Sequence, residues 1–423
     1  MQTSTIFSII KRSIIILLVF HFSQLFSQSN FQRGVKANFG MKTNLLSGLD
    51  SIGMDDWAQV STGIGVIQNN GQPNTTLFPF TAHVKDRVAG KGDASVWTST
   101  SKGADNPNTW TIGSGSSSGK TDLINVYAHA RRDGQDSLWY FIAAERMVTN
   151  GATTVDFEFM RNGITISNSG VVHGLGTDSG RTAGTVVGPV INSGGNIDRP
   201  GDILIITEYG GNNVSTSLYM WTSNPPSGVT FEQGLNTAPF GWALINPPNN
   251  SIVAGQNSTA VQTGPWGTFQ YSGGDSTNTL GALAFVEVGI NMTKFGLDDY
   301  NTCTSVKQAI VRSRTSPSFT SNLADFAGPL QFSLNTCSQI SVQKLEDFDE
   351  SFSTTQDRGT KNWNLSLYRS SILPANLIGT VTSASMLGIF DTLPRGTYIA
   401  VEADTANWTH LGIIKTSKLY SDS

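Results

Sequence analysis

The stretch SLWYFIAAERMVTNGATTVDFEFM, residues Ser137 to Met160, decides the fold class. Its second half alternates apolar residues with Asp156 and Glu158, which is the two-residue period of a β-strand with one solvent face. Its first half is apolar at nearly every position, as in an interior strand. Asn150-Gly151 lies between the halves, and this dipeptide is typical of tight hairpin turns. The stretch therefore predicts two β-strands joined as a hairpin, with Asp156 and Glu158 exposed.

Similar patterns recur on both sides of this stretch. TDLINVYAHA predicts a hairpin partner for SLWYFIAAERM, with charged residues at the turn around Asp133-Gly134. GDILIITEYGG with STSLYMWTS predicts a further strand pair, and LGALAFVEVGINM predicts a buried strand. Only Thr304 to Arg314 leaves a choice, between a short surface helix and an irregular strand. We expect an all-β protein whose first domain, residues 34–338, is a large jelly-roll-like β-sandwich.

Composition and the N-terminus indicate export. Charged residues make up 14% of the chain, below the roughly 25% typical of soluble domains, and 44 glycines suit an extracellular β-protein. Lys11 and Arg12 precede the apolar run SIIILLVFHF, so residues 1–27 read as a signal peptide cleaved after Ser27. An N-terminal membrane anchor is the alternative, but the run is shorter than the ~20 residues that span a bilayer. No later segment resembles a transmembrane helix.

A secreted chain makes its cysteines informative. Cys303 and Cys337 are the only two, and an oxidising compartment favours a disulfide between them, worth roughly 3–4 kcal/mol. Two buried thiols are the alternative. The formal net charge of −4 without a long basic run argues against a nucleic-acid partner.

Catalytic motifs are weak. There is no H-E-x-x-H motif, and GSGSSSGKT, Gly113 to Thr121, lacks the strand and helix that frame a phosphate-binding loop. Asp156 and Glu158 are the best carboxylate pair for a glycosidase, although a solvent face explains them equally well. We therefore expect no enzyme, with a secreted hydrolase as the alternative. His129 reads as a structural histidine near a strand end, and Glu145 and Arg146 read as a cross-strand pair.

Three polar residues of the first domain offer a metal site. Asp93, Asp122 and Asn125 carry the hard oxygen ligands that Ca²⁺ prefers. Loop carboxylates also cap turns, which is the alternative.

Residues 339–423 begin a new pattern of short strands. The segments ISVQKLEDFD, KNWNLSLYR and GIFDTLPRGTYIAVEAD carry it, with F-x-x-L-P-x-G-T-Y-x-x-x-E from Phe390 to Glu402 as its most specific part. This region resembles the prealbumin-like B-type repeat of bacterial surface adhesins, the class seen in collagen adhesins and serine-aspartate repeat proteins. The resemblance implies a small prealbumin- or Ig-like sandwich, and we expect it to lack its last strand.

This resemblance also implies two chemistries. Some members form a Lys–Asn isopeptide bond, for which Lys344 and Glu402 occupy the positions of the lysine and the catalytic acid; ordinary strand residues are the alternative. Other members bind Ca²⁺ through an acidic loop. Here that loop offers Asp347, Asp349, Ser351 and Asp357, and a solvated acidic turn is the alternative.

The first domain is similar to a secreted β-sandwich module that precedes such repeats in bacterial surface proteins. GKTDLINVYAHA, RPGDILIITEY and FVEVGINMTKFGLDDYNTC carry the similarity. It implies a non-enzymatic role in adhesion, display or as a stalk, with an extracellular protein or glycan as partner. A carbohydrate-binding module is the alternative, in which exposed indole rings stack on sugars. The candidates for this role are Trp97, Trp110, Trp221, Trp242 and Trp266.

Overall fold

The computed structural model describes residues 11–18, 35–41, 43–46, 54–59, 63–88, 92–98, 100–211, 214–269, 276–298, 305–347, 363–383, 388–394, 396–402 and 408–415. Within these ranges the regular structure is β-strand apart from three short 3-10 helices, η1 (Val35–Asn38), η2 (Pro107–Thr109) and η3 (Pro374–Asn376). The all-β prediction is confirmed. None of the described helices is long and apolar enough to cross a membrane.

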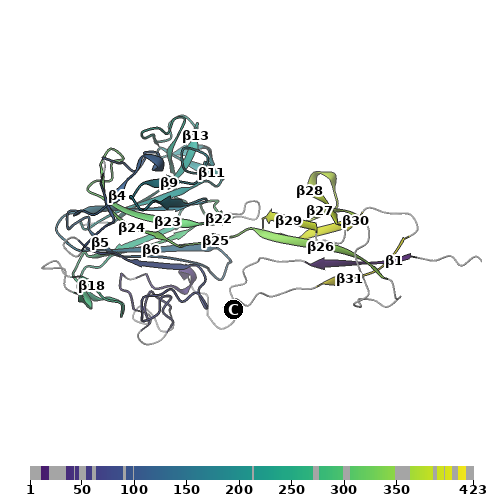
Figure 1. Cartoon of the computed structure of the whole chain (residues 1–423), viewed down its shortest axis with the longest axis horizontal. Coiled ribbons are helices and arrows are strands. Elements are labelled where there is room, and N and C mark those ends of the chain that lie inside the picture. Colours follow the sequence, from purple (N-terminus) through teal and green to yellow (C-terminus); the bar gives the residue numbers. More distant parts are fainter. Residues whose placement is uncertain are drawn as a thin grey trace, which may run out of the picture. The chain divides into compact units, whose positions relative to one another are not determined.

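The chain divides into two compact units. The larger comprises residues 26–298 and 304–335, and the smaller comprises residues 1–25, 299–303 and 336–423. The larger unit contains two main sheets, which Figure 1 shows as facing layers.

The eleven-stranded sheet of the larger unit has the order β10-β11-β15-β13-β12-β7-β23-β24-β3-β4, with β14 paired to β15. In that order its strands are β10 (Thr185–Ile191), β11 (Gly194–Arg199), β15 (Phe240–Ile245), β13 (Ser215–Ser223), β12 (Ile203–Tyr209), β7 (Thr153–Met160), β23 (Gln308–Arg314), β24 (Leu323–Leu330), β3 (Val96–Trp97), β4 (Ile112–Gly113) and β14 (Phe231–Glu232).

The five-stranded sheet has the order β16-β21-β6-β5-β2. Its strands are β16 (Ile252–Gln256), β21 (Phe285–Asn291), β6 (Leu138–Arg146), β5 (Leu123–Arg132) and β2 (Thr81–Lys85). Short two-stranded ladders join β8 (Ile164–Ile166) to β9 (Val172–Gly174), β17 (Val261–Gln262) to β20 (Thr279–Leu280), β18 (Thr268–Phe269) to β19 (Ser276–Thr277), and β22 (Ser305–Val306) to β25 (Leu334–Asn335).

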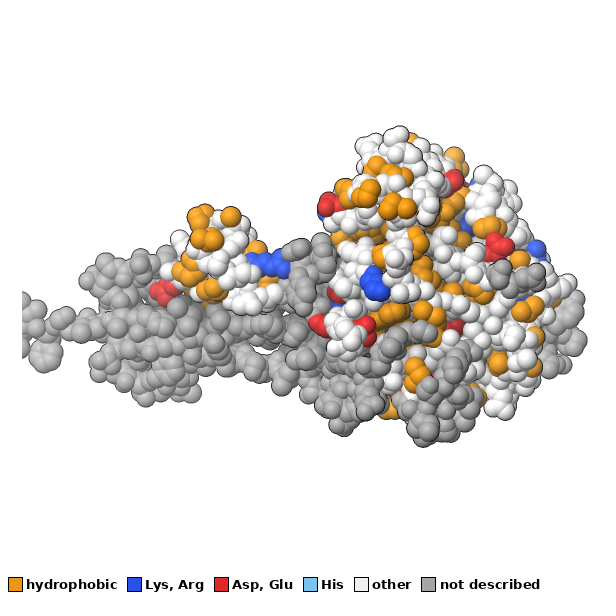
Figure 2. All heavy atoms as spheres, turned by 180° about the vertical axis from the view of Figure 1, so that it is seen from behind, with side chains coloured by type: hydrophobic (Ala, Val, Ile, Leu, Met, Phe, Trp, Pro, Cys, Tyr) orange, Lys and Arg blue, Asp and Glu red, His pale blue; other side chains and the backbone are white. Residues whose placement is uncertain are grey.

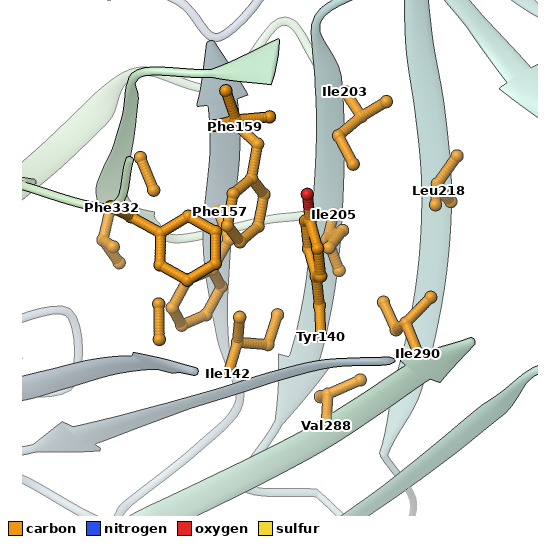
Figure 3. Packing of buried hydrophobic residues seen from close by; sticks show 14 of the residues in the cluster. Tyr140, Ile142, Phe157, Phe159, Ile203, Ile205, Leu218, Val288, Ile290 and Phe332 are labelled. Carbon is orange, nitrogen blue, oxygen red and sulfur yellow. The ribbon is translucent and has the colours of Figure 1, made fainter. Parts of the chain in front are cut away.

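The main hydrophobic core lies between the two sheets. Figure 3 shows Tyr140 and Ile142 of β6 facing Phe157 and Phe159 of β7, with Phe332 beside them. The apolar half of the alternating β7 sequence therefore points into the sandwich. At roughly 1.5–3 kcal/mol for each fully buried large apolar side chain, this layer supplies the main driving force for the sandwich.

Both sheets are also covered on their outer faces. Phe39, Trp57 and Phe78 pack on the outer face of the five-stranded sheet, against Phe141 and other residues of β5 and β6. Tryptophan-rich clusters cover the outer face of the eleven-stranded sheet. As a result every residue of β5, β6 and β7 is buried. The predicted solvent face with Asp156 and Glu158 is wrong, because an additional layer of chain closes over it.

Local strand pairing differs from the sequence predictions at one hairpin and agrees at two others. The hairpin around Asn150-Gly151 is wrong, because β6 and β7 belong to different sheets and β7 pairs with β12 and β23 instead. Gly151, at φ 80°, nevertheless turns the chain from one sheet to the other. The hairpins β5–β6 and β12–β13 are as predicted. The ambiguous segment around Thr304 to Arg314 is the irregular strand, since β23 has register shifts against β24.

The smaller unit is a small two-sheet structure. One sheet has the order β29-β26-β1-β31 and the other β28-β27-β30. Its core consists of apolar residues of β26, β27 and β29, including Val342, Leu367 and Phe390. The strands are β29 (Gly388–Leu393), β26 (Ser338–Asp347), β1 (Lys11–Leu18), β31 (Trp408–Lys415), β28 (Leu377–Ser383), β27 (Trp363–Arg369) and β30 (Tyr398–Glu402). β1, which belongs to the predicted signal peptide, lies between β26 and β31 and pairs with both.

Candidate functional site

The carboxylates that resembled a catalytic pair lie in a buried ion-pair network. Glu158 accepts hydrogen bonds from Arg181 Nε at 2.6 Å and Arg312 Nη1 at 2.6 Å. Asp156 accepts from Arg312 Nε at 3.2 Å and Arg314 Nε at 3.1 Å. All five side chains have 0% exposure. Because these carboxylates face arginines inside a closed layer, they are not placed to meet a glycosidic substrate.

Tryptophans enclose this network. The guanidinium of Arg181 lies 4.6–5.0 Å from the ring centroids of Trp110, Trp221 and Trp242, within the range of cation–π attraction. These three rings are fully buried, and Trp97 is 5% exposed. The proposed sugar platform is therefore wrong for four of its five tryptophans. Only Trp266 is half-buried, and its Nε1 donates to the hydroxyl of Tyr127 at 3.1 Å.

The electrostatics of the network favour its charged form. Burial alone would raise the pKa of Glu158, but Arg181 and Arg312, through charge and hydrogen bonding, bring the pKa below its ordinary value. Nearby, burial raises the pKa of Asp202 to about 7, although both its carboxylate oxygens accept backbone N–H groups, from Arg161 and Thr182. The network therefore has the properties of a structural ion cluster.

A second polar cluster lies on the outer face of the five-stranded sheet. Glu145 accepts hydrogen bonds from Tyr127 and from Asn125 Nδ2, the latter at 2.7 Å. Asn125 also contacts His83 Nε2 at 3.0 Å through its Oδ1. Burial raises the pKa of Glu145 despite these bonds. Arg146 donates instead to the carbonyls of residues 149, 151 and 283, so the predicted pairing of Glu145 with Arg146 is wrong.

Charged residues near the β5–β6 turn are also buried and partnered. Arg131 pairs with Asp55 at 2.8 Å, and Arg132 pairs with Asp298 at 2.7 Å. His129 is fully buried and its Nδ1 lies 2.9 Å from the hydroxyl of Thr81. Burial and the charge of Arg131 hold the pKa of His129 well below its usual range. His129 is thus a structural histidine, as predicted.

The strongest candidate for a functional site is an acidic cluster. Asp86, Asp93 and Asp325 each contribute one carboxylate oxygen, and these oxygens lie within 4.8 Å of one another. Asp86 follows β2, Asp93 precedes β3 and Asp325 lies in β24, where it is paired with Val96. Such a group of hard oxygen ligands is suited to a divalent cation.

Sequence reasoning identified part of this cluster. Asp93 belongs to it, whereas the predicted ligand Asn125 contacts Glu145 and His83 instead. Asp122 is not in the three-residue group, although its charge contributes to raising the pKa of Asp325, after burial and Asp86. Asp86 and Asp325 were missed. Asp86 lies in the same connection between β2 and β3 as Asp93, whereas Asp325 comes from the distant strand β24 and shares no local spacing with them.

The candidate residues of the smaller unit are only partly described. Lys344 lies on β26 and the half-buried Glu402 on β30, which belong to different sheets. Asp347 ends β26, and its side chain lies outside the described residues, as do the side chain of Lys344 and the whole of Asp349, Ser351 and Asp357. Cys337 is buried, while Cys303 lies outside the described ranges. The isopeptide, calcium-loop and disulfide assignments therefore stay predictions.

The larger unit thus presents buried, partnered charges throughout its interior and one cluster of carboxylates without basic partners among its described residues. The resemblances to a surface module and to a B-type repeat also stay predictions. Comparison of the chain with protein-family models, with curated proteins and with solved structures finds no match.

Proposed function

We propose that this chain is a secreted, non-enzymatic extracellular protein with an adhesion, display or stalk role. The observation that carries the proposal is the use of the interior charges. The acids and bases that would be candidates for catalysis, Asp156 and Glu158 with Arg181 and Arg312, are paired with one another under a tryptophan layer. Such a network rigidifies a scaffold rather than exposing reactive groups.

The surface supports contact with a protein partner. Figure 2 shows mostly uncharged groups, with hydrophobic side chains among them and few charges, on the visible face of the larger unit. The β10–β11 hairpin presents Val187, Val190 and Ile191, which are 37%, 37% and 52% exposed. Its two-residue turn, Asn192-Ser193, has positive φ at both positions and fits a tight hairpin. Exposed apolar side chains gathered on one hairpin favour a protein interface.

Binding and hydrolysis assays on the full chain test this proposal. We expect saturable binding to at least one member of a panel of immobilised extracellular-matrix proteins, with no release of product from polysaccharide or peptide substrates. Val190→Ser combined with Ile191→Ser should weaken binding. Leu77→Ser, at another apolar residue that is 50% exposed, serves as the matched control and should leave binding unchanged.

Two outcomes would contradict the proposal. Sugar or peptide fragments released by the purified chain would show an enzyme. Binding confined to a glycan array, and lost on Trp266→Ala, would instead favour the carbohydrate-binding alternative, which retains only this one of its five tryptophans.

A further inference from the structure

The acidic cluster lies where the edges of the two main sheets meet. β2 is the terminal strand of the five-stranded sheet, and β24 with β3 lies near one end of the eleven-stranded sheet. Asp86 directly follows β2, Asp93 lies shortly before β3, and Asp325 belongs to β24. The three carboxylates therefore connect both layers of the sandwich.

In each carboxylate one oxygen accepts hydrogen bonds, which orient the side chain, and the other oxygen has no described donor. Asp86 Oδ1 accepts from Ser95 Oγ at 2.8 Å, and Asp93 Oδ1 accepts from Ser95 N at 2.9 Å. Asp325 Oδ2 accepts from Leu123 N at 2.7 Å. Asp86 Oδ2, Asp93 Oδ2 and Asp325 Oδ1 are buried and have no hydrogen-bond partner within the described structure.

Two of these oxygens belong to deeply buried residues, whereas Asp86 is half-buried. Asp93 is 3% exposed and Asp325 is 0% exposed. A buried carboxylate oxygen without a donor is costly, so each such group needs an explanation. In the described part of the chain, no basic nitrogen forms an ion pair with any of the three carboxylates. Within the described structure, one oxygen of each carboxylate therefore has no hydrogen-bond donor, and none of the three carboxylates has an ion-pairing base.

We propose that Asp86, Asp93 and Asp325 bind a Ca²⁺ ion that ties the two sheets of the larger unit together. A bound cation would supply the missing charge. This site is independent of the proposed partner surface on β10.

The ligand chemistry favours calcium over other metals. Three carboxylates and no histidine or cysteine form the cluster, whereas zinc sites use mainly nitrogen and sulfur. Three protein carboxylates suit Ca²⁺, which takes six to eight oxygen ligands, better than Mg²⁺, which usually keeps several waters and binds through one or two carboxylates. Backbone carbonyls and water would complete the six to eight oxygens that Ca²⁺ takes.

Calorimetric titration of the chelator-treated full chain tests the site. We expect Ca²⁺ to bind with a dissociation constant of about 10⁻³ M or tighter, as in extracellular modules, and to raise the midpoint of thermal unfolding. Mg²⁺ should have a much smaller effect. Asp93→Asn and Asp325→Asn should each weaken binding at least about tenfold. Asp198→Asn, at an exposed aspartate, is the matched control and should titrate like the wild type.

Terbium luminescence locates the ion. Trp97 Nε1 donates to the backbone carbonyl of Asp325 at 3.1 Å, so its indole lies beside the site and should sensitise bound Tb³⁺. Trp97→Phe should lose most of this emission while retaining the heat of Ca²⁺ binding, and excess Ca²⁺ should quench the wild-type signal. This test does not depend on whether the aspartate variants fold. A folded wild type that gives no binding heat with millimolar Ca²⁺, or unchanged emission from Trp97→Phe, would overturn the proposal.

Discussion

Replacing Glu158 with glutamine tests how much the buried ion-pair network stabilises the larger unit. The substitution keeps the side-chain volume and removes the charge that faces Arg181 and Arg312. Three contacts are affected: Arg181 Nε at 2.6 Å, Arg312 Nη1 at 2.6 Å and Arg181 Nη2 at 3.3 Å. The new amide also places a donor against guanidinium groups, which only donate. The change therefore removes the carboxylate that pairs with Arg181 and leaves Arg312 with Asp156 as its carboxylate partner.

The expected cost follows from these contacts. A hydrogen bond to a charged group contributes about 1.5–3 kcal/mol, and Glu158 makes two short ones. Removing one partner of a buried ion pair costs about 3–5 kcal/mol, because the remaining charge stays desolvated. We therefore expect Glu158→Gln to lower the free energy of unfolding by about 3–5 kcal/mol. Urea unfolding followed by tryptophan fluorescence measures it, since Trp110, Trp221 and Trp242 surround the network.

Controls separate this effect from a general loss of charge. Glu208→Gln makes the same chemical change on β12 at a partly exposed residue and should change stability by about 0.5 kcal/mol or less. In a double-mutant cycle with Arg181→Met, Glu158→Gln should cost at least about 1 kcal/mol less than in the wild type, because the two residues interact directly. A loss below about 1 kcal/mol for Glu158→Gln alone, with a native spectrum, would refute this reasoning.

Three further predictions concern other parts of the chain. Burial depresses the pKa of His129 in the folded state, so its contribution to the free energy of unfolding is present above about pH 6.5 and is lost below it, as the unfolded chain takes up a proton. Below that pH, urea unfolding should show that the wild type loses about 1.4 kcal/mol more stability per pH unit than His129→Phe. Equal slopes for the two proteins would contradict this. Cys337→Ser should cost roughly 3–4 kcal/mol under oxidising conditions and nothing extra in reductant; a wild type insensitive to reductant would argue for free thiols. N-terminal sequencing of the exported chain should begin at Gln28, whereas an exported chain that retains residues 11–18 would keep β1 in the mature fold.

Alternation in the sequence predicted much of the strand structure but not what covers each face. The apolar residues of TTVDFEFM point into the sandwich, as their period indicates. The two-residue period shows only that one face of the strand is apolar and the other polar, and it does not show what packs on the polar face. Here tryptophans cover the polar face, together with Arg181 and with arginines of β23, a strand far from β7 in the sequence. One local signal was available: Arg312 and Arg314 are spaced two residues apart like Asp156 and Glu158, and Arg312 lies directly opposite Asp156 in the ladder.

The acidic cluster was harder to predict for a related reason. Asp93 stood out as a loop carboxylate, but Asp86 directly follows one strand and Asp325 lies within another, where nothing in the local sequence indicates a ligand. The cluster exists because the edges of two sheets meet, and a single sequence does not show which edges do so. Asn125 was misassigned because its side chain belongs to the polar cluster on the outer face of the five-stranded sheet, where it contacts Glu145 and His83.

The treatment of buried carboxylates elsewhere in the larger unit strengthens the calcium proposal. Asp156 and Glu158 are neutralised by arginines, and Asp202 satisfies both oxygens with backbone N–H groups. Asp93 and Asp325 are equally buried, yet each keeps an oxygen that no described donor reaches. A fold that satisfies its acids this completely in one layer would be expected to do so in the next. A divalent cation satisfies these oxygens and offsets the repulsion among the carboxylates at once, which no single hydrogen-bond donor at this position would do.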